Sequence, residues 1–559
     1  MSNPFFNPPI QDSVMAKRSA LKDKGAQVML SFPRASLKER PEHLTEALSY
    51  CKEAGRSANW VQIIGGSAWS FSPLSDYPDL DHQVDDDELA EMRKLIEICR
   101  AEGAQVAWMS TQWAPPPQLF EKYPQTQNLQ TGAFWSFVER AIREAFAQLD
   151  LDEITASLFE RPGTLFAQPF FRDFNYGEPA QAAEVHVDNW PYLSFADHVR
   201  LLLQAAARAC HAQGKTFAVF SGVSYPFQEQ LLIDALTDWP SDLPILLEHP
   251  YSNGDFNPWF PPSRLLSALP HLSHGLVSCG GLQSNGLGEI PFCFPELMQQ
   301  HVLFAHEATP HLRRLGVRPV WAGKSLIKTP NEVNLEVVLR LAENPLLDTD
   351  QLWLAWATRR YNELVAEDIA DILRPTDRAN MDTFFTFGVK LNDRSRLPDF
   401  EALQRSLIND GKAYAAWAPT PSARQDVYEL VVAPNEKTIR RMNEKHGDAL
   451  MDIEESLAKI RWLEDKVSEE DYQQINQVFL DFKDWVTLHI YQIESYIWYR
   501  MFLGDQSERN RQKALESLDN LEIYMDYVSG ARPEASELVD REALKRFAVT
   551  LKERLMLSE

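Results

Sequence analysis

Eight short apolar segments alternate with amphipathic ones over the first 345 residues, and this alternation constrains the fold more than any other feature. The apolar segments have the length of buried strands, and those between them show the periodicity of helices with one apolar face. The predicted strands are residues 26–32, 59–64, 105–110, 153–159, 216–220, 244–247, 275–279 and 318–321. Eight such units in sequence predict an α/β fold, a closed parallel (β/α)8 TIM barrel, because eight strands enclose an interior that side chains fill.

An open, doubly wound sheet is the alternative. It would need a phosphate-binding glycine loop after the first strand, and Ser31-Phe32-Pro33-Arg34 is not one. The predicted helices 41–54, 86–101 and 195–212 are each followed by a glycine, as expected at a helix C-terminus.

The alternation stops near residue 345, and the rest of the chain reads as helical. We therefore expect an N-terminal extension (1–25), a barrel (26–345), a helical and connecting region (346–433) and an α-helical C-terminal domain (434–559). Residues 484–503 carry a stripe of aromatic side chains. Such a stripe is typically buried, either in its own domain or against a second subunit, which would make the chain a homodimer through its C-terminal helices.

Composition excludes several classes of partner. The formal net charge of −25 argues against nucleic acid or an anionic membrane surface, because both are bound by cationic proteins. The N-terminal residues lack an apolar run of signal-peptide length, and no stretch is long and apolar enough to span a bilayer. The 5 cysteines are scattered, which is typical of free, buried thiols in a reducing compartment. These features predict a cytoplasmic protein.

Polar, aromatic and glycine-rich residues follow the predicted strands, where a parallel barrel carries its active site. Carboxylates beside aromatic planes are typical of a sugar site. Hydrolysis of a glycosidic bond needs an acid for the leaving oxygen and a second carboxylate as nucleophile or base. Glu160 follows the fourth strand, where apolar surroundings would raise its pKa to suit an acid. Glu248 and Asp255 compete for the second role, and Glu289 is a third candidate, expected to be exposed.

The candidates for substrate binding are other residues at or near these strand ends: Trp113, Arg161, Tyr225, His249, Trp259, Gln283, Asn285 and Lys324. This set contains no Ser-His-Asp arrangement and no histidines and carboxylates at metal-ligand spacing. We therefore expect neither a metal nor a cofactor, and an oligosaccharide as substrate.

Two of these segments resemble a known family. HPYSNGDFNPWF, with His249 and Gly254-Asp255-Phe256, is similar to the His…Gly-Asp-Phe segment after the sixth barrel strand of glycoside hydrolase family 67 α-glucuronidases. SCGGLQSNGLGEIPF is similar in spacing to the family's Gln-x-Glu-x-x-Gly segment, and Glu160 stands where the family's general acid ends the fourth strand. The resemblance covers roughly residues 150–360, with a helical tail after it as in the family.

The resemblance implies an inverting glycosidase that removes a terminal sugar, such as glucuronic acid, from an oligosaccharide. Glu160 would protonate the leaving group, and Asp255 would help a water attack. The sequence departs from the family at Gln283, where a base carboxylate is expected, and at Glu248, where a cation is expected. These departures favour a changed, neutral sugar preference, or a non-catalytic carbohydrate-binding barrel. A sugar isomerase, or an aldolase using Lys324, is a further alternative on the same scaffold.

Overall fold

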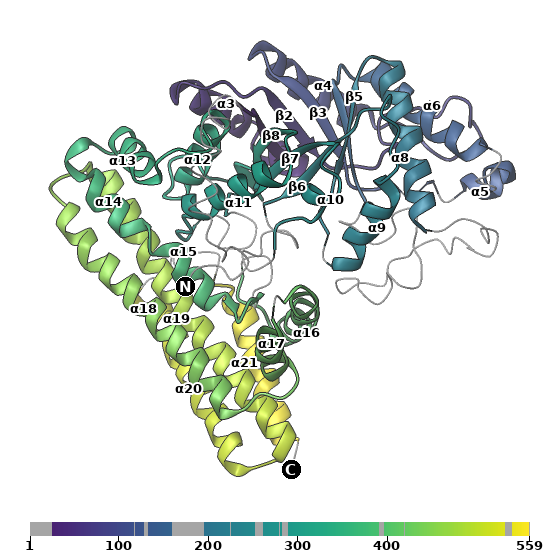
Figure 1. Cartoon of the computed structure of the whole chain (residues 1–559). Helices are drawn as coiled ribbons and strands as arrows, with labels where there is room; N and C mark the ends of the chain where they lie inside the picture. The colour runs from purple at the N-terminus through teal and green to yellow at the C-terminus, as the bar shows by residue number, and fades with distance from the viewer. Residues whose placement is uncertain are drawn as a thin grey trace.

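The computed structural model describes residues 25–113, 115–116, 118–127, 132–158, 195–223, 225–251, 261–278, 280–281, 289–390, 396–418, 420–531 and 539–557. Within these ranges the chain forms a (β/α)8 barrel followed by a region of long helices (Figure 1). The predicted fold class is therefore confirmed.

The barrel is closed by eight parallel strands in sequence order, with β1 paired to both β2 and β8. The strands are β1 (Gln27–Pro33), β2 (Trp60–Ile64), β3 (Gln105–Ser110), β4 (Glu153–Ser157), β5 (Thr216–Phe220), β6 (Leu246–Pro250), β7 (Ser273–Ser278) and β8 (Leu312–Val317). In β2, β4 and β6 every residue is buried. Helices cover the outside of the barrel and side chains fill the inside, so both faces of these strands are buried, including the polar residues Gln62, Glu153 and Glu248.

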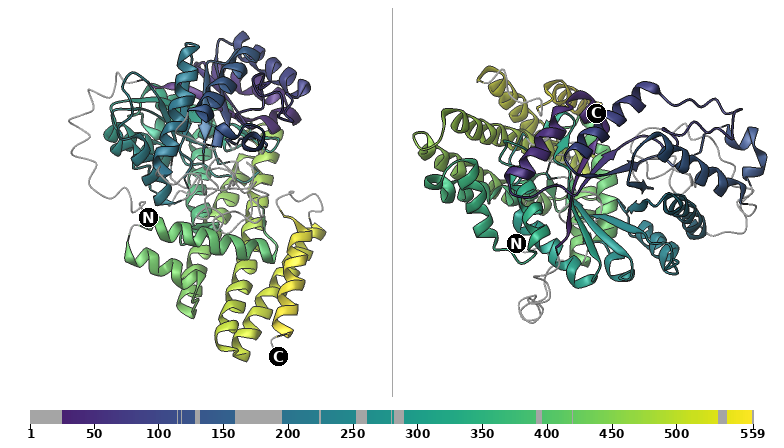
Figure 2. Two further views of the ribbon diagram at one scale, coloured as in Figure 1. Left: turned by 90° about the vertical axis from the view of Figure 1, so that its right-hand side faces the viewer. Right: turned by 90° about the horizontal axis from the view of Figure 1, so that it is seen from above.

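Helices surround the barrel and bury an apolar face against the strands (Figure 2). They are α2 (Arg34–Glu39), α3 (Glu42–Glu53), α4 (Asp86–Ala101), α5 (Leu119–Lys122), α6 (Ala133–Gln148), α8 (Phe195–Ala212), α9 (Pro226–Leu236), α10 (Leu265–Ala268), α11 (Pro295–Ala308) and α12 (Glu332–Glu343). Gly55, Gly103 and Gly214 follow α3, α4 and α8 with φ of 77°, 77° and 69°. Glycine adopts this left-handed conformation without the steric penalty of a Cβ atom, as predicted for these helix ends.

Two strands lie elsewhere than the sequence analysis placed them. The sixth strand was expected at 244–247 but lies at Leu246–Pro250, so Glu248 and His249 belong to the strand itself. The eighth was expected at 318–321 but is Leu312–Val317, a segment that could also have continued the helix before it; that helix, α11, ends at Ala308. The apolar residues of Leu312–Val317 fit either pattern, and only pairing with β7 and β1 makes this segment a strand.

After the barrel come α13 (Thr349–Arg360), α14 (Ala366–Leu373), α15 (Thr376–Thr383), α16 (Phe400–Trp417), α17 (Pro421–Val431), α18 (Glu436–Ile460), α19 (Glu469–Asp505), α20 (Glu508–Ala531) and α21 (Arg541–Met556). One short hairpin, β11 (Phe385–Thr386) with β12 (Val389–Lys390), interrupts them and was not expected. The aromatic stripe of α19 is buried as predicted, including Trp485, Tyr496 and Trp498. It packs within this same chain, for example through Phe384 and Phe400.

The helical region lies on the side of the barrel where the strands end. In Figure 1, α15 lies below the barrel, and two of its side chains hydrogen-bond the segment that leads from β7 to α11. Among the described residues, no helix is long and apolar enough to cross a membrane. Cys51, Cys99, Cys210 and Cys293 are free and buried.

Candidate functional site

Six of the predicted site residues lie outside the described part of the chain. They are Glu160, Arg161, Asp255, Trp259, Gln283 and Asn285. The other five, which are Trp113, Tyr225, Glu248, His249 and Lys324, have defined positions.

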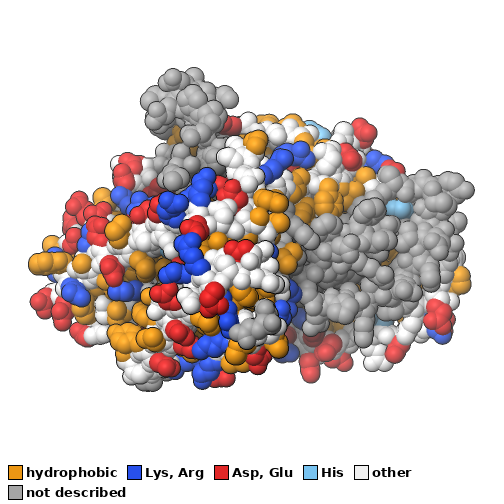
Figure 3. Space-filling view, turned by 90° about the horizontal axis from the view of Figure 1, so that it is seen from below, with side chains coloured by type: hydrophobic (Ala, Val, Ile, Leu, Met, Phe, Trp, Pro, Cys, Tyr) orange, Lys and Arg blue, Asp and Glu red, His pale blue; other side chains and the backbone are white. Residues whose placement is uncertain are grey.

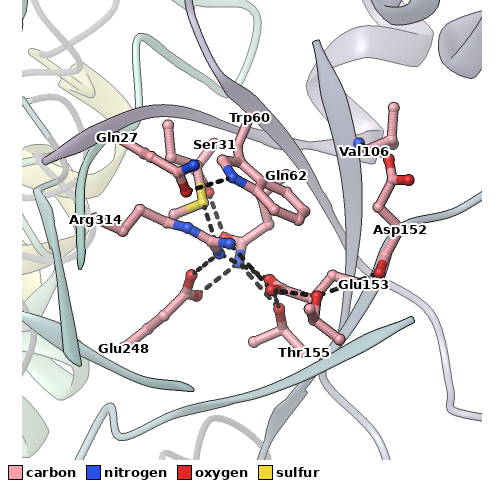
Figure 4. Close-up of polar contacts among 12 residues, drawn as sticks. Gln27, Ser31, Trp60, Gln62, Val106, Asp152, Glu153, Thr155, Glu248 and Arg314 are labelled. Atoms are coloured by element: carbon pink, nitrogen blue, oxygen red, sulfur yellow. Dashed lines mark hydrogen bonds and ion pairs between the residues drawn. The ribbon is translucent and has the colours of Figure 1, made fainter. Parts of the chain in front are cut away.

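Glu248 is not at the mouth of the barrel, and this corrects its assignment as a catalytic candidate. Its side chain is fully buried inside the barrel, where Arg314 Nη1 donates to its Oε1 at 2.7 Å (Figure 4). The same guanidinium donates to both oxygens of Glu153, at 2.8 and 3.0 Å. Gln62 Nε2 donates to Glu248 Oε2 at 2.7 Å. Both carboxylate oxygens of Glu248 therefore accept hydrogen bonds from side chains of the barrel interior.

This interior cluster contains one more carboxylate than cation. Arg314 lies over the ring of Trp60, 4.2 Å from its centroid, and Trp60 Nε1 donates to Gln27 Oε1 at 2.9 Å. Burial raises the pKa of Glu248, and nearby Glu153 raises it further, against the lowering effect of Arg314. The cluster joins buried side chains of β2, β4, β6 and β8, since Arg314 and Gln62 both donate to Glu248 and Arg314 also donates to Glu153.

His249 points to the opposite face of β6 and lies in a buried chain of hydrogen bonds. Ser221 Oγ lies 2.7 Å from His249 Nδ1, His249 Nε2 lies 2.9 Å from His274 Nδ1, and His274 Nε2 lies 2.9 Å from Leu269 O. A carbonyl can only accept, so His274 Nε2 must carry a proton. It follows that His249 Nε2–H donates to His274 Nδ1, and that the Ser221 hydroxyl donates to His249 Nδ1.

His249 and His274, the two histidines of this hydrogen-bond series, are both neutral. Burial holds the pKa of His249 well below its usual range and lowers that of His274 to about 4. A second proton on either ring would put two donors face to face. His249 is therefore fully buried and hydrogen-bonds residues next to β6, Ser221 after β5 and His274 in β7.

Trp113 and Tyr225 also occupy defined positions. Trp113 is fully buried; its indole Nε1 donates to Ser110 O at 3.2 Å, and its ring meets Trp69 edge-on at 6.0 Å. This ring therefore packs in the core and offers no exposed face to a sugar. Tyr225 precedes α9, is half-buried and stacks on Phe227 at 5.7 Å between ring centroids.

Lys324 does lie at the carboxyl end of the barrel, on a short hairpin that directly follows β8. The hairpin pairs β9 (Val320–Trp321) with β10 (Lys324–Ser325), and Lys324 is directly opposite Trp321. Lys324 Nζ lies 2.5 Å from Glu289 Oε1, and the two side chains are 39% and 21% exposed. Arg318, which follows β8, lies over the Trp321 ring at 5.1 Å from its centroid.

Sequence reasoning did not single out Trp321 and Arg318, because it placed both in the eighth strand. It expected Glu289 to be exposed, although this residue is mostly buried against Lys324. A usable signal was present, since Ala322-Gly323 between Trp321 and Lys324 is a two-residue turn with glycine at its second position. No group of three or more histidine, cysteine or acidic side chains suited to a metal ion occurs among the described residues.

Comparisons with known proteins identify structural likeness but no sequence family. No family model matches the sequence, and no curated protein matches it. A solved GH138 enzyme targeting the pectin rhamnogalacturonan II is similar over 96% of this chain and 83% of its own, with a TM-score of 0.58 and 11% identity. At this identity the likeness shows a shared fold, including both the barrel and helices after it.

Two further solved structures are similar over much of the chain. A mutant O-GlcNAc hydrolase from Thermobaculum terrenum matches at TM-score 0.41 and 10% identity, over 94% of each chain. A GH115 4-O-methyl-α-glucuronidase with specificity for decorated arabinogalactans matches at TM-score 0.37 and 11% identity, over 87% of this chain and 61% of its own. TM-scores this low carry no argument about function.

Proposed function

We propose that this chain is a glycoside hydrolase acting at the carboxyl end of its barrel. The observation that carries the proposal is the shared architecture with the GH138 enzyme along 96% of this chain, barrel and helical region together. A fold hosts many activities, so the argument also needs suitable side chains. The exposed end of the barrel supplies them in Glu289, Lys324 and Trp321, a combination suited to sugar hydroxyls and a sugar ring.

The proposed reaction is removal of a terminal sugar, a glucuronic acid or a related pyranose, with inversion of configuration. Glu160 acts as the acid and Asp255 as the base, as the family 67 resemblance implies. An inverting pair leaves space for a water, so their carboxyl groups would lie about 6.5–9.5 Å apart. Because Glu248 is bound to Arg314, it no longer argues for a neutral sugar. Arg318 and Lys324 are cations near the mouth that are compatible with a uronic acid.

A non-catalytic sugar-binding barrel is the second candidate. The observation that favours it is the loss of Glu248 as a carboxylate for chemistry, together with Gln283 where a base is expected. An aldolase is less suitable, because a Schiff-base lysine is buried in apolar surroundings, whereas Lys324 is partly exposed and paired with Glu289.

The test is a screen of aryl glycosides and glucuronidated oligosaccharides, with the anomer of the first-formed product followed by NMR. Glu160→Gln should abolish hydrolysis of natural linkages and spare more activity on activated aryl glycosides, whose leaving groups need no proton. Asp255→Asn should remove most activity on both classes, since water activation is always needed.

A surface variant provides the control for this screen. Glu454→Gln changes an exposed carboxylate paired with Lys483 in the helical region, and it should leave hydrolysis unchanged. Sugar binding without any hydrolysis would reject the hydrolase in favour of the binding barrel. Full activity of Glu160→Gln on a natural linkage would reject the assigned acid.

A further inference from the structure

The hairpin after β8 holds an aromatic ring and a cation side by side at the mouth of the barrel. Opposed residues of an antiparallel pair project to the same face, so Trp321 and Lys324 share one side of the hairpin. Trp321 is partly exposed, while Val320 beside it is fully buried. Val320 therefore packs the hairpin against the core, and Trp321 is left partly exposed to solvent.

The hairpin turn is strained and is fixed by its surroundings. Ala322 and Gly323 both have positive φ, 47° and 73°. Alanine seldom adopts this conformation, and such strain persists only where neighbouring structure enforces it. A Cβ atom on Gly323 would meet Glu39 Oε2 at 2.9 Å, so the turn also packs closely against the end of α2. The backbone that carries Trp321 and Lys324 is thus held in place by the turn.

Glu289, the carboxylate paired with Lys324, directly precedes a segment that side-chain hydrogen bonds hold in place. Residues 290–294, directly after Glu289, form no strand. Their backbone N–H and C=O groups are instead hydrogen-bonded by side chains from α12 and the residue before it. Asn331 accepts from Phe292 N at 2.6 Å and donates to Ile290 O at 2.9 Å. Asn334 accepts from Phe294 N at 3.0 Å and donates to Phe292 O at 2.7 Å.

Two further hydrogen bonds to this segment come from α15 in the helical region. Thr376 Oγ1 accepts from Cys293 N at 3.1 Å, and Asn380 Nδ2 donates to Pro291 O at 2.9 Å. All four side chains are buried, at 3% exposure or less. Glu289 therefore extends from a segment fixed by both parts of the molecule.

We propose that Trp321, Lys324 and Glu289 form a pyranose-binding subsite beside the reaction centre. The inference rests on the proposed function for the position of that centre. The carboxylate accepts hydrogen bonds from one or two adjacent hydroxyls, and the ammonium donates to another, which is the pattern that vicinal diols match. The indole offers its exposed surface to the apolar face of the ring, with Arg318 behind it. The backbone segments that carry these side chains are held beforehand, which reduces the entropy lost when the sugar binds.

The test measures sugar binding by the full chain, separately from hydrolysis. The probes are methyl glycosides of glucose, galactose, glucuronic acid, galacturonic acid and N-acetylglucosamine, followed by saturation-transfer NMR and tryptophan fluorescence. At least one should bind. Trp321→Ala and Glu289→Gln should each raise its dissociation constant about tenfold, the effect of losing one well-placed contact. Circular dichroism confirms that each variant is folded.

Two variants in the helical region serve as matched controls. Trp462→Ala removes an indole that is 75% exposed, and Lys483→Gln removes a lysine 35% exposed that is paired with Glu454 at 2.7 Å. Neither should change sugar affinity. Equal affinity in all four variants, or no binding of any probe by the unaltered chain, would overturn the subsite. Hydrolysis that persists unchanged in Trp321→Ala and Glu289→Gln would overturn the subsite but not the hydrolase. Sugar binding that these variants weaken, in a chain without hydrolytic activity, would support the subsite and overturn the hydrolase.

Discussion

Arg314 is the cation that pairs with both carboxylates of the interior cluster, Glu153 and Glu248. It is 3% exposed, and its guanidinium contacts Glu153, Glu248 and the ring of Trp60. Arg314→Met keeps much of the apolar volume but leaves two buried carboxylates without a cation. We expect a loss of about 3–5 kcal/mol in the free energy of unfolding, measured by urea denaturation at neutral pH.

An exposed arginine provides the comparison. Arg509 pairs with Glu436 at 2.6 Å, with side chains 66% and 54% exposed. Arg509→Met should change the free energy of unfolding by less than about 1 kcal/mol. Equal losses in the two variants would show that the interior cluster does not stabilise the barrel.

Glu248→Gln tests the protonation of the same cluster. A carboxyl whose pKa is raised on folding contributes stability at low pH that is lost as pH rises through its folded pKa. The variant lacks this loss, so its stability relative to the unaltered chain should improve between pH 5 and pH 8. Gln62 and Ser31 can adapt, because an amide and a hydroxyl can reverse their donor and acceptor roles. A relative stability that worsens with pH would mean that Arg314 lowers this pKa instead.

Among single elements, the β9–β10 hairpin offers a direct test of stored strain. Asparagine tolerates positive φ better than alanine and is favoured at the first position of such two-residue turns. Ala322→Asn should therefore stabilise the protein by up to about 1 kcal/mol, as measured by thermal denaturation. Gly323→Ala should act in the opposite direction, because φ is 73° and the added Cβ would meet Glu39. A destabilising Ala322→Asn would show that the turn is not strained.

The side-chain clamp on residues 290–294 can be tested with one isosteric change. Asn334→Asp keeps an acceptor for Phe294 N but removes both donors, and it places a carboxylate against the carbonyl oxygens of Gly280 and Phe292. We expect a loss of roughly 3 kcal/mol in the free energy of unfolding. The control is Asn435→Asp, where the side chain only accepts, from Lys437 N and Thr438 N at the start of α18. That variant should be neutral, since either residue caps a helix well.

At the scale of the whole molecule, buried histidines determine the response to acid. Six described histidines have pKa values lowered by burial, to about 4 for His274 and His489 and about 3 for His301 and His446. The remaining two are His198 and His249. Unfolded histidines bind protons near pH 6.5, so below that pH the unfolded state takes up more protons than the folded state. Stability therefore falls as pH falls.

Three buried carboxyls act in the opposite sense. The pKa values of Glu248, Glu332 and Asp377 are raised by burial, that of Asp377 to about 7. Because six histidines outnumber three carboxyls, the histidines should dominate, and the free energy of unfolding should fall as pH falls below 6.5. Urea midpoints should therefore drop steeply from pH 6.5 to pH 5. A constant or rising midpoint over this interval would contradict the neutral state of these histidines.

On the face seen from below, acidic and basic side chains of the described residues are interspersed with apolar ones (Figure 3). The exposed ion pairs of the described residues include Arg509–Glu436. Pairs of this kind each contribute little to the free energy of unfolding, so stability depends mainly on the buried core shared by the barrel and the helical region.

The sequence determined the barrel and the helical region by itself, because hydrophobic periodicity is a local property that repeats with each βα unit. It also determined the burial of Trp485, Tyr496 and Trp498, since an aromatic stripe on one helix must be covered. The site was less accessible to such reasoning. Glu248 and His249 were expected directly after the sixth strand, at the mouth of the barrel, whereas both lie within β6 and are buried.

Only the tertiary structure decided which of these residues face which surface. A shift of two residues at the start of β6 and three at its end moved Glu248 from the mouth into the interior and turned His249 to the outer layer. Arg314 lies 161 residues from Glu153 and 66 from Glu248 in sequence, and closure of the barrel alone brings them together. Pairing with β1 and β7 likewise made Leu312–Val317 the eighth strand and left Trp321 and Lys324 for the hairpin. Strand limits and charge pairing depend on contacts between distant segments, which no local pattern encodes.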